Sequence, residues 1–183
     1  MADAIAELLK LVLACPGRVP AGGSSRRLDA LFAELAADRP VRTPEQIEAD
    51  IWTAWTDHDE PRAADRMDRA MACFGRKAFV VAEAELDALV AEQPAWAEAW
   101  NKRATLYFIL GRHDESMADI ARTLVLEPRH FGAICGFAQI CLAQGRHVEA
   151  LAALETALGV HPHLDSVRSA VDVLGKATGR RLN

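Results

Sequence analysis

The sequence predicts an all-α protein in which antiparallel helical hairpins stack side by side as a solenoid. Prolines stand 34 residues apart at Pro94, Pro128 and Pro162, and Gly-Arg-His recurs at the same spacing at 111–113 and 145–147. A fixed period of this length is typical of a helix–turn–helix unit that buries its apolar face only by stacking on its neighbours. The chain is 51% hydrophobic and rich in alanine, without a strand-like alternation of Val, Ile and Thr, which favours helices.

Small and large residues recur in a fixed order within each period. With Ala97 as position 1, small residues stand at positions 8 and 20, where two helices must cross closely. Glycine at position 15 ends the first helix, and proline at position 32 ends the second. The unit 95–128 has Trp100, Ala104, Tyr107, Gly111, Ser116, Ile120 and Pro128 at positions 4, 8, 11, 15, 20, 24 and 32. The next unit has Ile134, Phe137, Ala138, Cys141, Gly145, Ala150, Leu154, Ala157 and Pro162 at positions 4, 7, 8, 11, 15, 20, 24, 27 and 32.

With this pattern the chain resembles the tetratricopeptide-repeat family, specifically its small bacterial members. The resemblance implies a right-handed superhelix of helical pairs, closed by a capping helix. One unit is degenerate, since Lys77 stands where glycine is expected. The expected units are, in order, an N-terminal helix with a linker (1–25), a helical pair (26–60), the degenerate repeat (61–94), two full repeats (95–128 and 129–162) and the capping helix (163–178).

Residues 3–14 predict a short helix that partly resembles an export signal. Val12-Leu13-Ala14-Cys15 has the form of a lipoprotein cleavage site. However, Asp3 and Glu7 stand where a signal carries positive charge, and Lys10 interrupts the apolar run, which disfavours export. We therefore expect a cytoplasmic protein; the alternative is a periplasmic or lipid-anchored one, and a mapped N-terminus distinguishes the two. No stretch approaches the ~20 apolar residues of a transmembrane helix.

The next segment predicts a linker and two helices. Residues 16–25 are rich in Gly, Pro and Ser, and a helix is expected from Arg26 to Asp38. A second helix begins at Thr43-Pro44-Glu45-Gln46, with Thr as the cap, Pro at the first position and Gln reaching back. It is expected to run to Asp57, with an apolar face formed by Ile51, Trp52 and Trp55. In the repeat frame this pair fits a worn-down fourth repeat. After the repeats, the apolar spacing of 164–176 predicts the helix that covers the last unit.

Charge and cysteine usage exclude several classes of protein. The net charge is −5 without a stripe of Lys and Arg, so nucleic acid is not an expected partner. The four cysteines have no C-x-x-C spacing and are expected to be small buried hydrophobes in a reducing compartment.

Nothing in the sequence indicates a reaction, a cofactor or a metal. None of the six histidines has a second His or Cys at helical spacing, as the common helical zinc sites require. His113 and His147 hold equivalent corners of successive repeats, and we expect both to be solvated and away from any binding face. Nucleophile, phosphate-loop and metalloprotease motifs are absent, so the sequence indicates a protein that is not an enzyme.

In the resembled family, the first helices of successive repeats line a concave groove, and positions 2, 5, 9 and 12 face it. The predicted partner-binding residues are therefore apolar with a few polar points: Met67, Met71, Phe74, Glu98, Asn101, Thr105, Phe108, Cys135, Gln139 and Leu142. Methionine and phenylalanine suit an adaptable contact with a helix or an extended peptide. Alternatively, the helix at 3–14 or 164–176 fills the groove within the chain.

The resemblance also excludes one specificity. Members that grip a chaperone's C-terminal carboxylate carry Lys and Asn at positions 5 and 9, whereas this chain has Met67 and Met71, then Asn101 and Thr105, then Cys135 and Gln139. We expect a non-catalytic interaction module, an adaptor or scaffold, that binds a protein or peptide segment in the groove. The alternatives are an envelope-associated assembly factor of the same fold and, less favoured, an enzyme without a recognisable motif.

Overall fold

The computed structural model describes residues 2–21, 25–37 and 40–179, and these form helices and turns without a strand. The α-helices are α1 (Ala2–Ala14), α2 (Arg26–Leu35), α3 (Pro44–Thr56), α4 (Pro61–Gly75), α5 (Phe79–Glu92), α6 (Ala97–Ile109), α7 (His113–Leu126), α8 (Phe131–Ala143), α9 (His147–Val160) and α10 (Asp165–Ala177), with a 3₁₀ turn, η1 (Cys15–Gly17).

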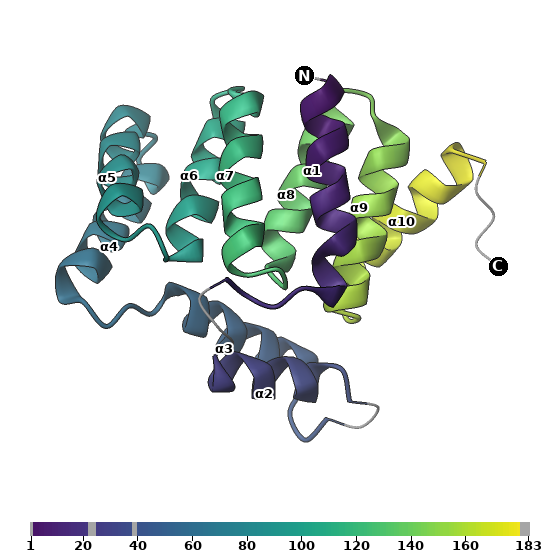
Figure 1. The fold of residues 1–183 in the computed structure, drawn as a ribbon, viewed down its shortest axis with the longest axis horizontal. Coiled ribbons are helices and arrows are strands. Elements are labelled where there is room, and N and C mark those ends of the chain that lie inside the picture. Colours follow the sequence, from purple (N-terminus) through teal and green to yellow (C-terminus); the bar gives the residue numbers. More distant parts are fainter. Residues whose placement is uncertain (1, 22–24, 38–39, 180–183) are drawn as a thin grey trace.

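The predicted all-α solenoid is confirmed. Helices α4–α5, α6–α7 and α8–α9 form hairpins that stand side by side, and α10 packs against α9 at the end of the stack (Figure 1). Gly111 and Gly145 take left-handed backbone conformations, with φ of 72° and 71°, and this turn reverses the chain between the two helices of each hairpin. Lys77 takes the same conformation at the equivalent corner, with φ of 58°, so the degenerate repeat keeps the turn at a steric cost that glycine avoids.

The largest core cluster joins the two full repeats to the N-terminal helix. Phe137 and Ala138 of α8 and Leu124 of α7 are fully buried in it. Small side chains at the crossings, such as Ala138 and Ala150, let the hairpin helices approach closely. The predicted capping helix contributes Val171 to the same cluster, which shields the last repeat from water.

Helix α1 packs on the second helices of the repeats, α7 and α9, and not on the first helices that line the groove. Its Ile5, Leu8 and Val12 are buried in the shared core. Cys15 is buried as well and donates its thiol hydrogen to the carbonyl oxygen of Leu11, at 3.3 Å; burial raises its pKa to about 11. The N-terminal segment is therefore an integral part of the core, and cleavage before Cys15 would remove a packed helix.

The helical pair α2–α3 lies across the foot of the stack (Figure 1), and α3 contacts α6. The pair therefore does not extend the stack as the fourth repeat considered from the sequence. Helix α2 ends at Leu35, earlier than the expected Asp38, which lies outside the described residues. The start of α3 agrees with the sequence, because Thr43 and Gln46 form both bonds of a capping box. Within the described residues no helix is long and apolar enough to cross a membrane.

Ala138 is fully buried at a helix crossing, whereas Ala143 on the same helix is exposed. We expect Ala138→Leu to lower the free energy of unfolding by ~1–3 kcal/mol, because the added methylenes overpack the crossing. Ala143→Leu should change it by less than ~0.5 kcal/mol. Urea denaturation followed by circular dichroism measures both. Equal decreases in the free energy of unfolding at the two positions would mean that the repeat positions are assigned wrongly.

Candidate functional site

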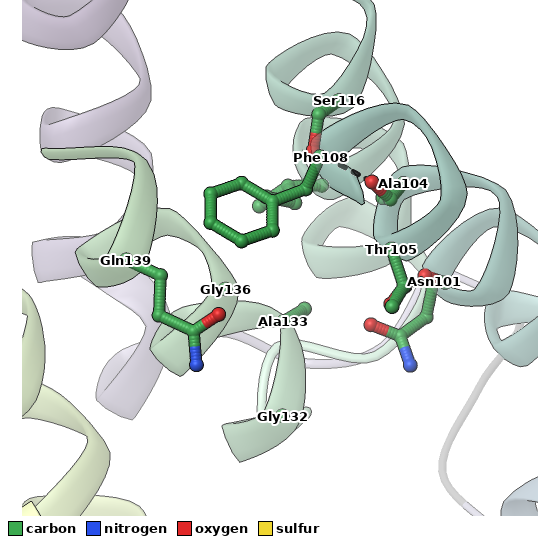
Figure 2. A pocket seen from close by; sticks show the side chains of 10 residues that line it. Asn101, Ala104, Thr105, Phe108, Ser116, Gly132, Ala133, Gly136 and Gln139 are labelled. Carbon is green, nitrogen blue, oxygen red and sulfur yellow. Dashed lines mark hydrogen bonds between the residues drawn. The ribbon is translucent and has the colours of Figure 1, made fainter. Parts of the chain in front are cut away.

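A small open pocket lies between the first helices of the two full repeats (Figure 2). Its volume is about 40 Å³, too small for an ordinary small-molecule ligand but sufficient for part of a side chain. Four predicted groove residues line it: Asn101, Thr105, Phe108 and Gln139. Its base is fixed by Ser116, whose hydroxyl donates to the carbonyl oxygen of Ala104 at 2.8 Å.

Two amide side chains flank the mouth of this pocket. Figure 2 shows Asn101 of α6 and Gln139 of α8 on either side of Ala133. Asn101 is largely buried and donates to Glu98 at 3.0 Å. Gln139 is exposed, and its side-chain amide forms no hydrogen bond within the described part of the chain. Amides on two neighbouring helices can donate to and accept from a peptide backbone laid across them.

The half-buried ring of Phe108 stacks on His113, with ring centroids 5.6 Å apart and planes inclined by 20°. This corrects the expectation that both corner histidines lie away from the groove. The left-handed turn at Gly111 folds the first residue of α7 back over the end of α6, which brings the imidazole onto Phe108. His147, at the equivalent corner of the next repeat, is exposed and follows the expectation.

A larger hollow of about 620 Å³ lies beside α4, and its lining residue from α6, Lys102, directly follows Asn101 of the α6–α8 pocket in the sequence. Predicted groove residues Met67 and Met71 line it, although Met67 is mostly buried. The rest of the lining comes from the end of α3 and the turn after it, from α4 and from α6: Thr56, Asp57, His58, Asp59, Ala64, Asp68 and Lys102. We call this cavity the acidic hollow, because three of its side chains are aspartates.

Glu98 corrects the predicted groove, because it is fully buried and cannot contact a partner. Its carboxylate lies 2.8 Å from Nε2 of His130 and 2.7 Å from Nζ of Lys102. Burial alone would raise the pKa of Glu98, but the hydrogen bonds from His130 and Lys102 and the positive charge of Lys102 outweigh it and lower the pKa. Glu98 thus joins α6 to the start of α8 as an ionised structural group.

Helix α3 packs through aromatic contacts on the end of the groove that lies near Glu98 and the start of α8. The Trp55 ring stacks on His130, with centroids 4.1 Å apart, and Trp52 packs edge-on against His130 and Phe131. Gly132, a position expected to face the groove, lines the α6–α8 pocket, but the Trp52 ring lies so close that it leaves no room for a Cβ there. The sequence predicted the apolar face of α3 but not what it packs against; the missing side chain at Gly132, which makes room for Trp52, was a local signal that could have indicated it.

The remaining predicted groove residues line neither hollow. Phe74 packs edge-on against Phe79 of its own hairpin. Cys135 is half-buried, and burial raises its pKa to about 11, so its thiol stays neutral at physiological pH. Leu142 is partly exposed on α8. Within residues 2–21, 25–37 and 40–179, no cluster of His, Cys, Asp and Glu is placed to hold a metal.

A scan against profiles of known protein families finds no match. Two curated proteins are similar in sequence. A TPR repeat-containing protein of Rhizobium etli is 35% identical over 157 residues, which cover 85% of this chain and 77% of that protein. Human RNA polymerase II-associated protein 3 is 33% identical over 84 residues, 46% of this chain and 13% of that protein.

Two solved structures share the fold. The TPR2B domain of yeast Sti1, in a complex with pHsp70, has a TM-score of 0.58 at 19% identity, covering 67% of this chain and all of that one. MamA AMB-1 has a TM-score of 0.55 at 18% identity, covering 84% of this chain and 81% of that one. At these identities the structures establish the architecture alone.

Gly132 and Gly136 form a matched pair on α8. A Cβ at Gly132 would stand 2.7 Å from the Trp52 ring, whereas one at Gly136 would stand 3.6 Å from Ile120, an ordinary contact. We expect Gly136→Ala to be neutral or to stabilise by up to about 1 kcal/mol. Gly132→Ala should destabilise by ~1–3 kcal/mol, because the packed indole must move. Thermal unfolding measures both; if the two substitutions stabilise alike, Trp52 does not sit on Gly132.

His161 also packs under α3, fully buried, with Nε2 3.3 Å from a carboxylate oxygen of Glu48. Its Nδ1 accepts a hydrogen bond from the backbone of His163. Burial lowers the pKa of His161 more than Glu48 raises it, and His163 lowers it further. The folded protein therefore binds fewer protons than the unfolded chain below the unfolded pKa of about 6.5, so this part of the stability is present above that pH and is lost as the pH falls.

We expect His161→Asn to reduce the loss of stability that the unaltered protein shows between pH 7.5 and pH 5, since asparagine does not titrate. Urea midpoints at a series of pH values measure this. His147→Asn, at an exposed corner, is the control and should leave the pH dependence as it was. An unchanged slope in His161→Asn would mean that this imidazole is not held neutral in the folded state.

Proposed function

The chain belongs to the tetratricopeptide-repeat family, and we propose from this that it is an adaptor that binds an extended or helical segment of a protein partner along α4, α6 and α8. Proteins of this fold serve as interaction modules, in which first helices present side chains that stacking does not use. The proposed occupied surface runs from the acidic hollow to the α6–α8 pocket. Its central residues are Phe108, Asn101, Thr105 and Gln139.

One observation carries the proposal: Phe108 and His113 form a stacked, partly exposed pair beside a pocket whose flanking amide, Gln139, has no partner among the described residues. An aromatic pair of this kind supplies a rigid apolar contact, and the amide can form hydrogen bonds that orient a peptide backbone. Affinity at such surfaces concentrates in a few central residues. Phe108 lies on the middle of the three first helices.

The position of the terminal helices supports an accessible groove. Helix α1 packs on α7 and α9, on the side of the second helices. Helix α10 packs on α9 at the end of the stack. The two segments considered from the sequence as groove fillers are thus both engaged elsewhere, and α3 approaches the groove at the level of Glu98 and Gly132.

The partner chemistry proposed here differs from that of the structural neighbour. The TPR2B domain of Sti1 was solved in a complex with pHsp70, which supports partner binding as a use of this architecture. This chain lacks the lysine and asparagine pair with which carboxylate-gripping members bind. Asn101 is turned toward Glu98, and Met67 and Met71 occupy the matching positions on α4. We therefore infer a partner recognised through internal side chains and backbone.

Substitutions at Phe108 and the two corner histidines test the groove. Phe108→Ala should weaken capture of partner from the lysate of the source cell by about tenfold or more, the result of losing a central contact worth ~1–2 kcal/mol. His113→Ala should weaken it less, by removing the ring that supports Phe108. His147→Ala, at the equivalent exposed corner, should leave capture unchanged.

Quantitative mass spectrometry of captured proteins provides the readout, and circular dichroism verifies that each variant keeps its helices. Undiminished capture by Phe108→Ala, with loss in His147→Ala, would move the binding surface to the loop edge of the repeats and overturn the proposal.

A further inference from the structure

The carboxylates of the repeats are paired with arginines almost everywhere that their side chains face a neighbouring helix. Arg103 holds Asp119 and Asp87 at 2.7 and 2.9 Å, and Arg112 holds Glu83 at 2.6 Å. These pairs join α6 to α7 within one hairpin and the α6–α7 hairpin to α5 of the preceding one, and they leave those carboxylates engaged. The acidic hollow is different, because the carboxylates of Asp59 and Asp68 form no ion pair or hydrogen bond within the part of the chain that the structure describes.

The positive groups near the hollow do not neutralise it. The ammonium group of Lys102 lies 2.7 Å from Glu98 and above the Trp52 ring, 5.5 Å from its centroid. Asp57 lies 3.4 Å from Arg27, but both side chains are more than half exposed, so that pair contributes little. The hollow therefore presents uncompensated negative charge over an apolar base.

That base is formed by Ala64, Met67 and Met71 of α4. Methionine adapts its shape to long aliphatic chains, and a lysine or arginine side chain carries such a stem below its charged head. A volume of about 620 Å³ exceeds what one such side chain needs. Apolar contact at the base and carboxylates at the rim match the two halves of this side chain.

We propose that the acidic hollow receives a lysine or arginine side chain of the partner segment that lies in the groove. The inference rests on the proposed function and adds the chemical class of the partner, a basic peptide segment. Asp59 and Asp68 would pair with the cationic head, and Met71 would contact its stem. The hollow and the α6–α8 pocket are both lined from α6, by the consecutive residues Lys102 and Asn101, and the proposal places one segment across both.

The test uses the full chain and a library of random ten-residue peptides displayed on phage. Selection on the unaltered protein should enrich peptides that contain Lys or Arg. An enriched peptide is then synthesised with a fluorescent label, together with a version in which norleucine replaces the basic residue. Fluorescence anisotropy should show binding about tenfold weaker for the norleucine peptide, the usual effect of losing a charge-assisted hydrogen bond.

Two double variants with the same change in net charge locate the effect. Asp59→Asn/Asp68→Asn should bind the basic peptide about tenfold more weakly and should no longer distinguish it from the norleucine peptide. Asp114→Asn/Asp172→Asn removes two exposed aspartates on α7 and α10 and should preserve the discrimination. Circular dichroism verifies the fold of both, and Asp68→Asn alone serves if the first pair loses helicity.

The outcomes separate this inference from the function on which it rests. If no peptide binds the unaltered protein, peptide recognition by the groove fails. If peptides bind without a preference for Lys or Arg, or bind Asp59→Asn/Asp68→Asn as tightly, the groove stands and the acidic hollow is overturned as its basic-residue site. Equal weakening in the two double variants would reveal only long-range attraction to an acidic protein, and would likewise overturn the hollow.

Discussion

One imidazole, that of His130, holds together the elements that shape the groove. Its Nδ1 accepts a hydrogen bond from the backbone of Ala133 and caps α8, which assigns the proton to Nε2, 2.8 Å from Glu98 of α6. Its face stacks on Trp55 of α3. The ring therefore fixes the start of α8 against α6 and docks α3 on both. The α6–α8 pocket and the acidic hollow, whose rim follows α3 directly, both depend on this contact.

The docking of α3 divides the concave surface into a structural part and a free part. Glu98 and Gly132 hold the same position in successive repeats. Glu98 is fully buried and hydrogen-bonded to His130, and the Trp52 ring packs closely against half-buried Gly132. One turn further along, Asn101 is buried and Cys135 is half-buried. The residues beyond them, Thr105 and Gln139, are exposed. The groove thus opens progressively along its first helices, away from α3.

The sequence predicted those contacts that join residues close in the chain or related by the repeat, and it did not predict the others. The 34-residue period predicted the contacts within a hairpin and between adjacent hairpins. The turns at Gly111 and Gly145 and the capping box at Thr43 could also be predicted, because each depends only on residues close in the sequence. Helix α3 is not part of the 34-residue repeats, so the repeat pattern could not predict its contacts with α6 and α8. The stacking of His113 on Phe108 was missed for another reason: equivalent corners share a backbone, but their side chains meet different neighbours.

The groove resists prediction because stacking and binding use different faces of the same helices. Ala138 must be small, since a neighbouring helix crosses it, and such requirements produce the repeat pattern. Gln139, the next residue, faces outward and meets no such requirement. Solenoid stability is roughly a sum of repeat and interface terms, so the outward positions can hold aspartates in one member and lysines in another at little cost to the fold. The partner is therefore specified by the side chains that the period leaves unconstrained, and only their placement in three dimensions shows which of them act together.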